Sequence, residues 1–516
     1  SLNYKEDYID AYSNLANVYF ETRNFSKSIN TIIKALNYDP KNQKLNFNLA
    51  FFFDENCQYQ KAVEQYHEAM RFGYSKEIVL NNIGNIYIKE KNYSKAKENF
   101  LECLKISSSN YLTINNLIRS LILKKDFAEA EKYQKLSDKL EIKNNIYFIN
   151  KAELLFFKKK YKQAENILKE FCKKNKYDIG ANISLSLIYS NLGKFKNSYK
   201  LIEDIYKLNP NHNTLNLIHS MNLLKKGNFK EGWKLYDKSL QIKDNYYPNI
   251  PFWKGEDLRK KKLLVYEDQG IGDSIQFSKF LFYLNKLCND IRIEVRESVV
   301  ELFQKNILNL KVYKKGSNSN CDYKISFVSL NNFFYENKNK KEEGLFKIDE
   351  EIISKWKKKI NSNKLKVGLT WSGNLYGVNQ PFRSIEIKKL EKILSLDCEF
   401  ICLQNDIWLR DKNYLNDSKI NNLGDNNFLE IAAIIENLDL VISVDTSILH
   451  LSSSLDKLTW GLFSFDQEWR WWKYNDPFFY KKLIEYKQDK FDDWDLVVNN
   501  VFKDLKKIID TKNHIK

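Results

Sequence analysis

Small and bulky hydrophobic positions repeat every 34 residues through the first half of the chain. A small residue recurs at seven positions with this spacing: Ser28, Ala62, Ala96, Ala130, Ala164, Ser198 and Gly232. A second series lies twelve residues upstream, and only Ile118 in it is large: Ala16, Ala50, Gly84, Ile118, Ala152, Ser186 and Ser220. A third series is bulky: Tyr19, Phe53, Tyr87, Leu121, Leu155, Tyr189 and Leu223. Small residues let two antiparallel helices approach closely, and bulky residues fill the groove between pairs. The period therefore predicts stacked helix–turn–helix units.

The repeated unit resembles the tetratricopeptide repeat. The first unit fits that pattern with Tyr12, Leu15, Ala16, Tyr19, Ser28, Ala35 and Pro40. We expect an α-helical solenoid of about seven repeats over residues 1–244, since units of this kind stack on their neighbours. The chain starts at Ser1 without an initiator Met or a signal peptide. We therefore expect a trimmed chain, with room for further repeats upstream.

The pattern changes after the last repeat. Residues 246–251 contain two of the six prolines and predict a linker. Short apolar runs then alternate with helical segments, at 263–267, 291–295, 366–370, 399–403 and 440–444. This alternation predicts parallel α/β layers. The simplest arrangement is two Rossmann-like lobes that face a cleft, over residues 245–345 and 346–516, with a closing helix at the C-terminal end.

Composition narrows the range of partners and cofactors. The net charge is +17, but Lys is spread evenly and no Arg-rich cluster accompanies it, so we expect no nucleic-acid partner. The basic surface could still help to hold an anionic substrate. Seven cysteines without a Cys-x-x-Cys pair indicate a reducing, cytoplasmic location. Five dispersed histidines favour no metal site, and no apolar run is long enough to span a membrane.

The first candidate site lies between a predicted strand and a predicted helix. There the sequence reads Asp268-Gln-Gly-Ile-Gly-Asp-Ser, with glycines at Gly270 and Gly272. Glycines permit a tight turn and a close backbone approach at the start of a helix. Two roles remain open for Asp273: it caps the helix, or it points into a cleft as a general base toward a hydroxyl.

The second candidate site follows the last buried strand. Asp445, Thr446 and Ser447 lie where a helix begins, and their hydroxyl and backbone N–H groups suit a diphosphate. His450 falls one helical turn after Ser447 and could stabilise a departing diphosphate. The alternative is structural, with Asp445 as a helix cap and His450 as a buried polar residue.

Further polar and aromatic residues lie in loops that should meet the cleft. Trp371, Ser372 and Asn374 follow one strand, and Gln404 ends another, where an amide could contact a base or a sugar. Arg383 could clamp a phosphate or form a surface ion pair. The dense segment Trp469-Arg470-Trp471-Trp472 either packs the closing helix or stacks on a sugar or base.

In order and spacing these motifs resemble those of bacterial tetratricopeptide-repeat glycosyltransferases related to the heptosyltransferase family, which have the GT-B fold. The resemblance covers residues 253–502 and implies a metal-independent, inverting transfer of a hexosyl or heptosyl group from a nucleotide sugar, without a cofactor. It implies that Asp273 is the base, and that Asp445, Thr446 and His450, with Ser447 beside them, bind the donor diphosphate. Donor-site roles are implied for the other matching positions: Gly270, Gly272, Trp371, Ser372, Asn374, Arg383 and Gln404.

Two functions follow for the whole chain. In the first, an enzyme transfers sugar to a protein or glycan acceptor recruited by the groove of the repeats. In the second, the chain is an inactive scaffold with a nucleotide-binding module, an alternative favoured by the departures from the motif at residues 376–380. The motif also departs from that of the relatives at residues 452–457. A homo-oligomer is compatible with either function.

Overall fold

A computed structural model describes residues 8–22, 24–243, 247, 249–306, 310–317, 320–335, 346–373, 380–471 and 480–514. The chain divides into two compact units, Ser1–Ile188 and Tyr189–Lys516, which are considered separately below. The predicted domain limits, after residues 244 and 345, stay predictions. The predicted linker at 246–251 lies partly outside the described residues.

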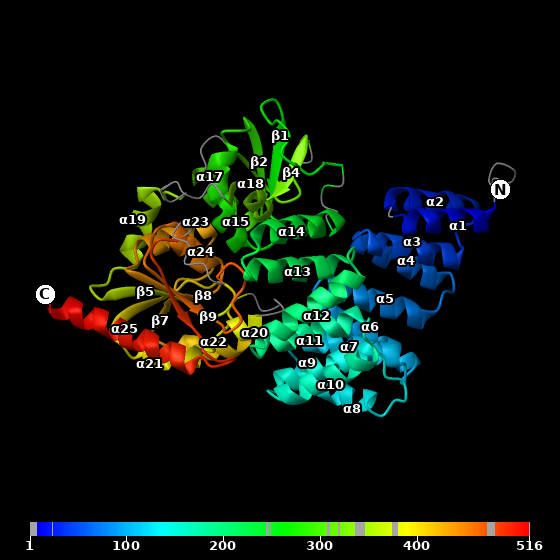
Figure 1. Cartoon of the computed structure of the whole chain (residues 1–516), viewed down its shortest axis with the longest axis horizontal. Helices are drawn as coiled ribbons and strands as arrows, with labels where there is room; N and C mark the ends of the chain where they lie inside the picture. The colour runs from blue at the N-terminus through cyan, green and yellow to red at the C-terminus, as the bar shows by residue number, and fades with distance from the viewer. Residues whose placement is uncertain are drawn as a thin grey trace. The chain divides into compact units, whose positions relative to one another are not determined.

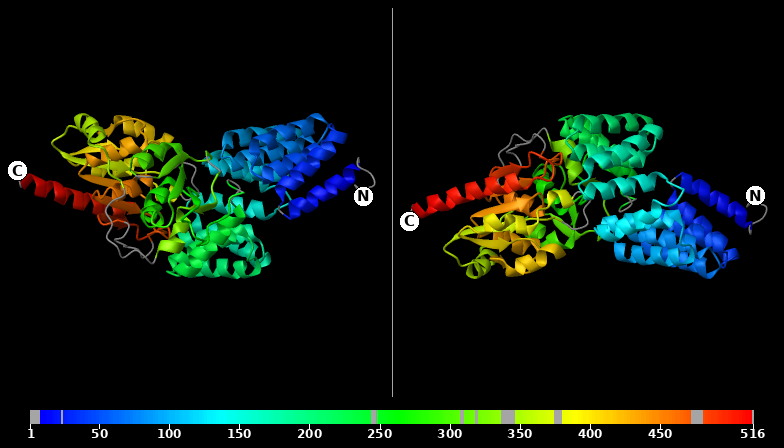
Figure 2. Two further views of the ribbon diagram at one scale, coloured as in Figure 1. Left: turned by 90° about the horizontal axis from the view of Figure 1, so that it is seen from above. Right: turned by 90° about the horizontal axis from the view of Figure 1, so that it is seen from below.

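The first half of the chain is helical, as the repeat predicts (Figure 1). Within the described residues fourteen helices precede the first strand: α1 (Ile9–Glu21), α2 (Phe25–Tyr38), α3 (Gln43–Glu55), α4 (Tyr59–Arg71), α5 (Lys76–Lys89), α6 (Tyr93–Ile106), α7 (Tyr111–Lys124), α8 (Phe127–Ser137), α9 (Asn145–Phe157), α10 (Tyr161–Lys174), α11 (Ile179–Asn191), α12 (Phe195–Leu208), α13 (Asn213–Lys225) and α14 (Phe229–Lys243). Two further views show the helices of the first unit, in blue and cyan, packed side by side (Figure 2). Members of both series of small residues lie at these contacts, since Ala16, Ala62 and Ala96 are all fully buried.

Local sequence sets both ends of the repeat helices. Asn24, Asn42 and Asn92 cap α2, α3 and α6, because each side-chain oxygen accepts a hydrogen bond from a backbone N–H in the first turn. The turn inside a repeat contains a residue with positive φ, again every 34 residues: Cys57, Lys91, Lys125, Lys159, Gly193 and Gly227. Glycine fills this left-handed position in only the last two of these turns, so the sequence alone did not reveal it.

The first sheet begins the second half of the chain. Its strands are β1 (Lys262–Tyr266), β2 (Asp290–Val295), β3 (Lys311–Lys314) and β4 (Tyr323–Ser326), all parallel, in the order β3-β2-β1-β4. The accompanying helices are α15 (Ile271–Phe277), α16 (Leu281–Leu284), α17 (Glu297–Asn306) and α18 (Asn331–Phe334), with short 3-10 turns η1 (Ser278–Phe280) and η2 (Val328–Leu330).

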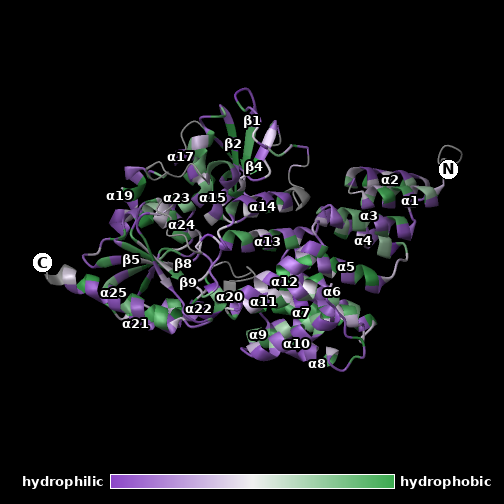
Figure 3. Cartoon of the chain, viewed as in Figure 1, coloured by the Kyte–Doolittle hydropathy of each residue, from purple (hydrophilic) through white to green (hydrophobic). Residues whose placement is uncertain are grey.

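The second sheet has six parallel strands, in the order β10-β9-β8-β5-β6-β7. They are β5 (Leu365–Thr370), β6 (Cys398–Cys402), β7 (Ile420–Asn422), β8 (Leu440–Val444), β9 (Thr459–Phe463) and β10 (Leu483–Lys487). The helices are α19 (Glu350–Lys359), α20 (Gln380–Arg383), α21 (Glu391–Leu394), α22 (Leu409–Asp417), α23 (Phe428–Glu436), α24 (Ser447–Ser454) and α25 (Asp495–His514), with the 3-10 turn η4 (Ile387–Leu390). Strand β8 is mainly hydrophobic and buried along its whole length (Figure 3), as parallel strands covered on both faces are.

The sheets confirm the predicted change from a helical solenoid to an α/β region. In each sheet the first strands are added on one side of the first strand, and the later ones lie on its other side. The strand order therefore reverses between β1 and β4 and between β5 and β8. Ligands of open α/β sheets bind outside the carboxyl ends of strands at such points. The assignment of the two sheets to Rossmann-like lobes stays a prediction.

The last repeat shares a hydrophobic core with the first sheet. Leu224 of α13 and Trp233 and Tyr236 of α14 belong to the same buried cluster as Val265 of β1 and Phe277 of α15. This part of the repeat therefore packs as one body with the first sheet.

The small series gives a stability prediction. A Cβ added at Gly84 would lie 2.4 Å from Cε1 of the fully buried Phe100 ring. Gly84→Ala should therefore destabilise the chain by about 1–2 kcal/mol, because overpacking outweighs the gain in helix propensity. Thermal unfolding followed by circular dichroism measures this.

Gly180→Ala is the matched control in the same unit. Its added Cβ would approach only the end of the Ile149 side chain, at 3.3 Å. We expect its melting temperature to stay close to that of the parent. An equal fall in both variants would contradict the packing argument.

Candidate active site

The first candidate loop connects β1 to α15, and Asp273 lies in the first turn of α15. The backbone N–H of Gly270 donates to Asp273 Oδ2 at 3.0 Å, which closes that turn. Gly270 is thus the N-cap residue of α15, and Asp273 is the third helical residue, whose carboxylate accepts from the N-cap N–H. Its other oxygen, Oδ1, forms an ion pair with Arg470, which follows β9 in the second sheet. Both side chains are about nine-tenths buried, at 12% and 9% exposed.

The second candidate loop connects β8 to α24. Asp445 and Thr446 precede the helix, and Ser447 is its first residue. The hydroxyl groups of Ser443 and Thr446 lie 3.2 Å apart. This loop therefore leaves backbone N–H groups at the start of α24, where a helix attracts negative charge.

His450 lies in the first turn of α24 and is buried. Its Nδ1 lies 2.6 Å from the hydroxyl of Tyr480, and its Nε2 lies 3.9 Å from Asp445 Oδ1. The ring also stacks on Trp471 at 5.1 Å. Burial lowers the pKa of His450 to about 4, although the charges of Asp445 and Asp273 oppose that change. The imidazole is therefore neutral at neutral pH.

The two loops meet at Gly272. A Cβ added there would lie only 2.5 Å from His450 Cδ2, so glycine alone permits this approach of backbone to ring. Helices α15 and α24 pack against each other here. The structure thus brings together the two motifs that are 177 residues apart at Asp273 and His450.

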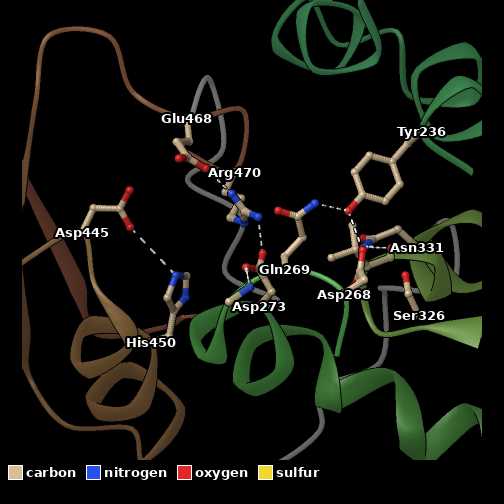
Figure 4. Close-up of polar contacts among 12 residues, drawn as sticks. Tyr236, Asp268, Gln269, Asp273, Ser326, Asn331, Asp445, His450, Glu468 and Arg470 are labelled. Carbon is tan, nitrogen blue, oxygen red and sulfur yellow. Dashed lines mark hydrogen bonds and ion pairs between the residues drawn. The ribbon is translucent and has the colours of Figure 1, made fainter. Parts of the chain in front are cut away.

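A chain of alternating charges continues from Asp273 across the site, and Figure 4 shows Arg470 between Asp273 and Glu468. Arg470 pairs with both Asp273 and Glu468. Arg383 then pairs with Glu468 at 2.9 Å and with Asp445 at 3.1 Å. Burial disfavours the ionised form of Glu468, but Arg383 and Arg470 outweigh it and lower its pKa to about 2. Three carboxylates therefore share two guanidinium groups.

The predicted donor residues around β5 and β6 form a local framework. Trp371 is fully buried, and its Nε1 donates to Asp411 at 3.2 Å. Gln404 Oε1 accepts from the backbone N–H groups of Trp371 and Ser372, at 3.2 and 3.0 Å. Its Nε2 donates to Ser372 Oγ at 2.6 Å and to the carbonyl of Asp406 at 2.9 Å. The amide of Gln404 thus shapes the loop after β5.

Some predicted residues lie outside the described part of the chain, and the site also contains residues that the sequence did not predict. Asn374, Trp472 and residues 376–379 lie outside the described residues. Sequence reasoning did not identify Glu468, Tyr480 or the repeat residue Tyr236 as part of the site. Only Glu468 had a nearby signal, since it immediately precedes the Trp469–Trp471 segment. Arg470 lies inside that segment, but the sequence does not indicate a role for it.

Two kinds of feature are absent from the described residues. These residues contain no group of three or more His, Cys, Asp and Glu side chains that could hold a metal ion. Among them no helix is both long and apolar enough to cross a membrane.

Two models of known protein families match separate parts of the chain. The family model described as glycosyltransferase family 9 (heptosyltransferase) matches residues 409–495. The tetratricopeptide repeat model matches residues 9–42, 79–110 and 179–212. The chain is therefore similar to tetratricopeptide repeats in three segments and to glycosyltransferase family 9 over residues 409–495. These matches support a glycosyltransferase with repeats.

Two solved structures are similar to part of the chain. One, titled as a functional characterisation of Pseudomonas aeruginosa pilF, is 22% identical, with a TM-score of 0.32, over 39% of this chain and 92% of its own. A tetratricopeptide repeat protein from Parabacteroides merdae is 14% identical, with a TM-score of 0.38, over 46% of this chain and 94% of its own. No curated protein matches the chain.

The buried imidazole predicts a pH dependence of stability. Between about pH 6.5 and 4 the unfolded chain protonates His450 whereas the folded chain does not, so stability falls as the pH falls through this window. His450→Gln should remove up to about 3 kcal/mol of that fall. Urea unfolding at several pH values measures it.

His67→Gln, on the exposed face of α4, is the control. We expect the stability of this variant to follow the pH dependence of the parent. A parent-like slope in His450→Gln would show that the buried ring is not the source.

Proposed function

We propose that this chain is an inverting, metal-independent glycosyltransferase that moves a hexosyl or heptosyl group from a nucleotide sugar to an acceptor recruited by its repeats. One observation carries the proposal. Asp273, at the carboxyl end of β1, and the Asp445–His450 turn, at the carboxyl end of β8, meet at Gly272. In this proposal the two sheets are the two lobes of a GT-B enzyme.

Asp273 is the proposed general base. Its carboxylate would accept the proton of an acceptor hydroxyl while that oxygen attacks the anomeric carbon. The bond from the sugar to the diphosphate breaks on the opposite face, so the configuration inverts. Arg470 holds Oδ1 and Gly270 holds Oδ2, and each oxygen keeps a second lone pair that could accept the proton.

The start of α24 is the proposed diphosphate site. The N–H groups of its first turn, the hydroxyls of Thr446 and Ser447, and Arg383 would stabilise the negative charge of the leaving group. Neutral His450 would add a hydrogen bond. The raised pKa of the buried Tyr480 keeps its hydroxyl protonated, so it can donate to Nδ1 and leave the ring proton on Nε2.

The repeats are the proposed acceptor arm. Tetratricopeptide repeats suggest interaction with another protein, and a glycosyltransferase implies a nucleotide-sugar donor. The acceptor in this proposal is a protein or a glycan.

The base assignment predicts a loss of turnover without a loss of donor binding. Asp273→Asn should lower kcat about 10²–10⁴-fold, because the amide cannot accept the proton. The donor KM should change little. A panel of nucleotide sugars, screened for thermal stabilisation of the parent, identifies the donor for the assay.

Asp54→Asn is the control, since Asp54 is also a buried carboxylate paired with a cation, at 2.8 Å from Lys89, but lies in α3. It should retain parental kcat. Parental turnover in Asp273→Asn would refute the base assignment.

Guanidinium and helix charges replace a metal ion in this proposal, which predicts that excess EDTA leaves the rate unchanged. Arg383→Gln should instead raise the donor KM by tenfold or more, since one charge-assisted contact to phosphate is lost. Recovery of an EDTA-treated enzyme only after divalent metal is added would contradict metal independence.

A second candidate function is an inactive nucleotide-binding scaffold. It is favoured by the closed network of ion pairs, in which Asp273, Arg470 and Arg383 already have protein partners. This candidate predicts thermal stabilisation by a nucleotide sugar in the screen, with no turnover for any acceptor protein or glycan tested.

A further inference from the structure

We propose that Tyr236, on the last repeat helix α14, is a positioning residue for the catalytic loop that holds Asp273. The proposal rests on the glycosyltransferase activity proposed above. It assigns part of the catalytic arrangement to the repeats themselves, beyond any role in acceptor recruitment.

Tyr236 makes two hydrogen bonds to the loop after β1 (Figure 4). Its hydroxyl donates to Asp268 Oδ2 at 2.7 Å and accepts from Gln269 Nε2 at 2.8 Å. The side chain is 1% exposed, so water does not compete for these bonds. The next residue is Gly270, whose N–H binds Asp273. The path from the repeat hydroxyl to the proposed base is therefore continuous.

The neighbouring part of α14 contacts the loop from the second sheet. The ring of Trp233 meets the ring of Trp469 edge to face, with centroids 4.9 Å apart and an interplanar angle of 84°. Trp469 immediately precedes Arg470. Lys225, on α13, forms an ion pair with Asp466 at 2.6 Å, and both side chains are mostly buried. One helix pair thus contacts both loops that supply the Asp273–Arg470 pair.

The hydroxyl of Tyr236 contributes more to this arrangement than packing. Asp268 is buried, and burial raises its pKa to about 7 while the hydrogen bond from Tyr236 lowers it. Removing the hydroxyl leaves a buried carboxyl group with one partner fewer, and the loop then relaxes toward other partners. A displacement of about 1 Å at a reacting group costs about 10²-fold in rate.

The test is Tyr236→Phe in the full chain, which keeps the buried ring and removes only the hydroxyl. We expect kcat to fall about tenfold or more, with the donor KM within about twofold of the parent. The donor is the nucleotide sugar found in the panel, and its thermal stabilisation of the variant should match that of the parent.

Tyr147→Phe is the matched control. Tyr147 is also a buried repeat tyrosine, whose hydroxyl donates to Asp138 at 2.8 Å and accepts from Lys151 at 2.9 Å, but it lies in the first unit. This control should keep parental kcat and should lose about as much melting temperature as Tyr236→Phe.

Three results would overturn the proposal: parental kcat in Tyr236→Phe, loss of donor binding, or a melting temperature well below that of Tyr147→Phe. The last two would make Tyr236 a general structural residue. If Asp273→Asn is also fully active, the proposed function fails instead. If Asp273→Asn is inactive while Tyr236→Phe is parental, only this inference fails.

Discussion

The approach of Gly272 to the ring of His450 fixes the geometry on which the candidate site depends. A side chain at position 272 would overlap the imidazole, so α15 and α24 can pack closely only with glycine there. This contact places the helix that follows β1 beside the helix that follows β8. Asp273 and Arg470 can then form their ion pair across the two sheets. The geometry of the site therefore follows from a missing Cβ atom.

The buried charges at this contact are costly, and their cost argues for a role beyond stability. Moving each ion out of water costs several kcal/mol, and the attraction between the paired ions often only offsets that cost. Here Asp273, Glu468 and Asp445 share Arg470 and Arg383. Each of the two guanidinium groups already pairs with two carboxylates. In the proposed function a substrate diphosphate would compete with these carboxylates for the two arginines.

The sequence predicted the features that a repeated or local residue pattern marks, and it did not predict those without such a mark. Helix pairing was predictable, because only small side chains such as Ala62 fit between helices. The left-handed turn residue at Cys57 was not, because glycine does not mark it. Asp273 and His450 were identifiable since each follows a buried strand. Tyr236 was not, because a bulky residue in a repeat is ordinarily core, and its hydrogen-bond partners come from another element.

The packing of α14 shows why the boundary of the repeat pattern differs from the boundary of the packed unit. The 34-residue period ends with the helix that contains Gly232, yet Trp233 and Tyr236 of that helix are buried with Val265 and Phe277. Burial of each large apolar side chain contributes about 1.5–3 kcal/mol, so a cut between repeat and sheet would remove several kcal/mol from the core. The last repeat is thus a structural part of the α/β region. Its helix α14 contacts both loops that carry Asp273 and Arg470.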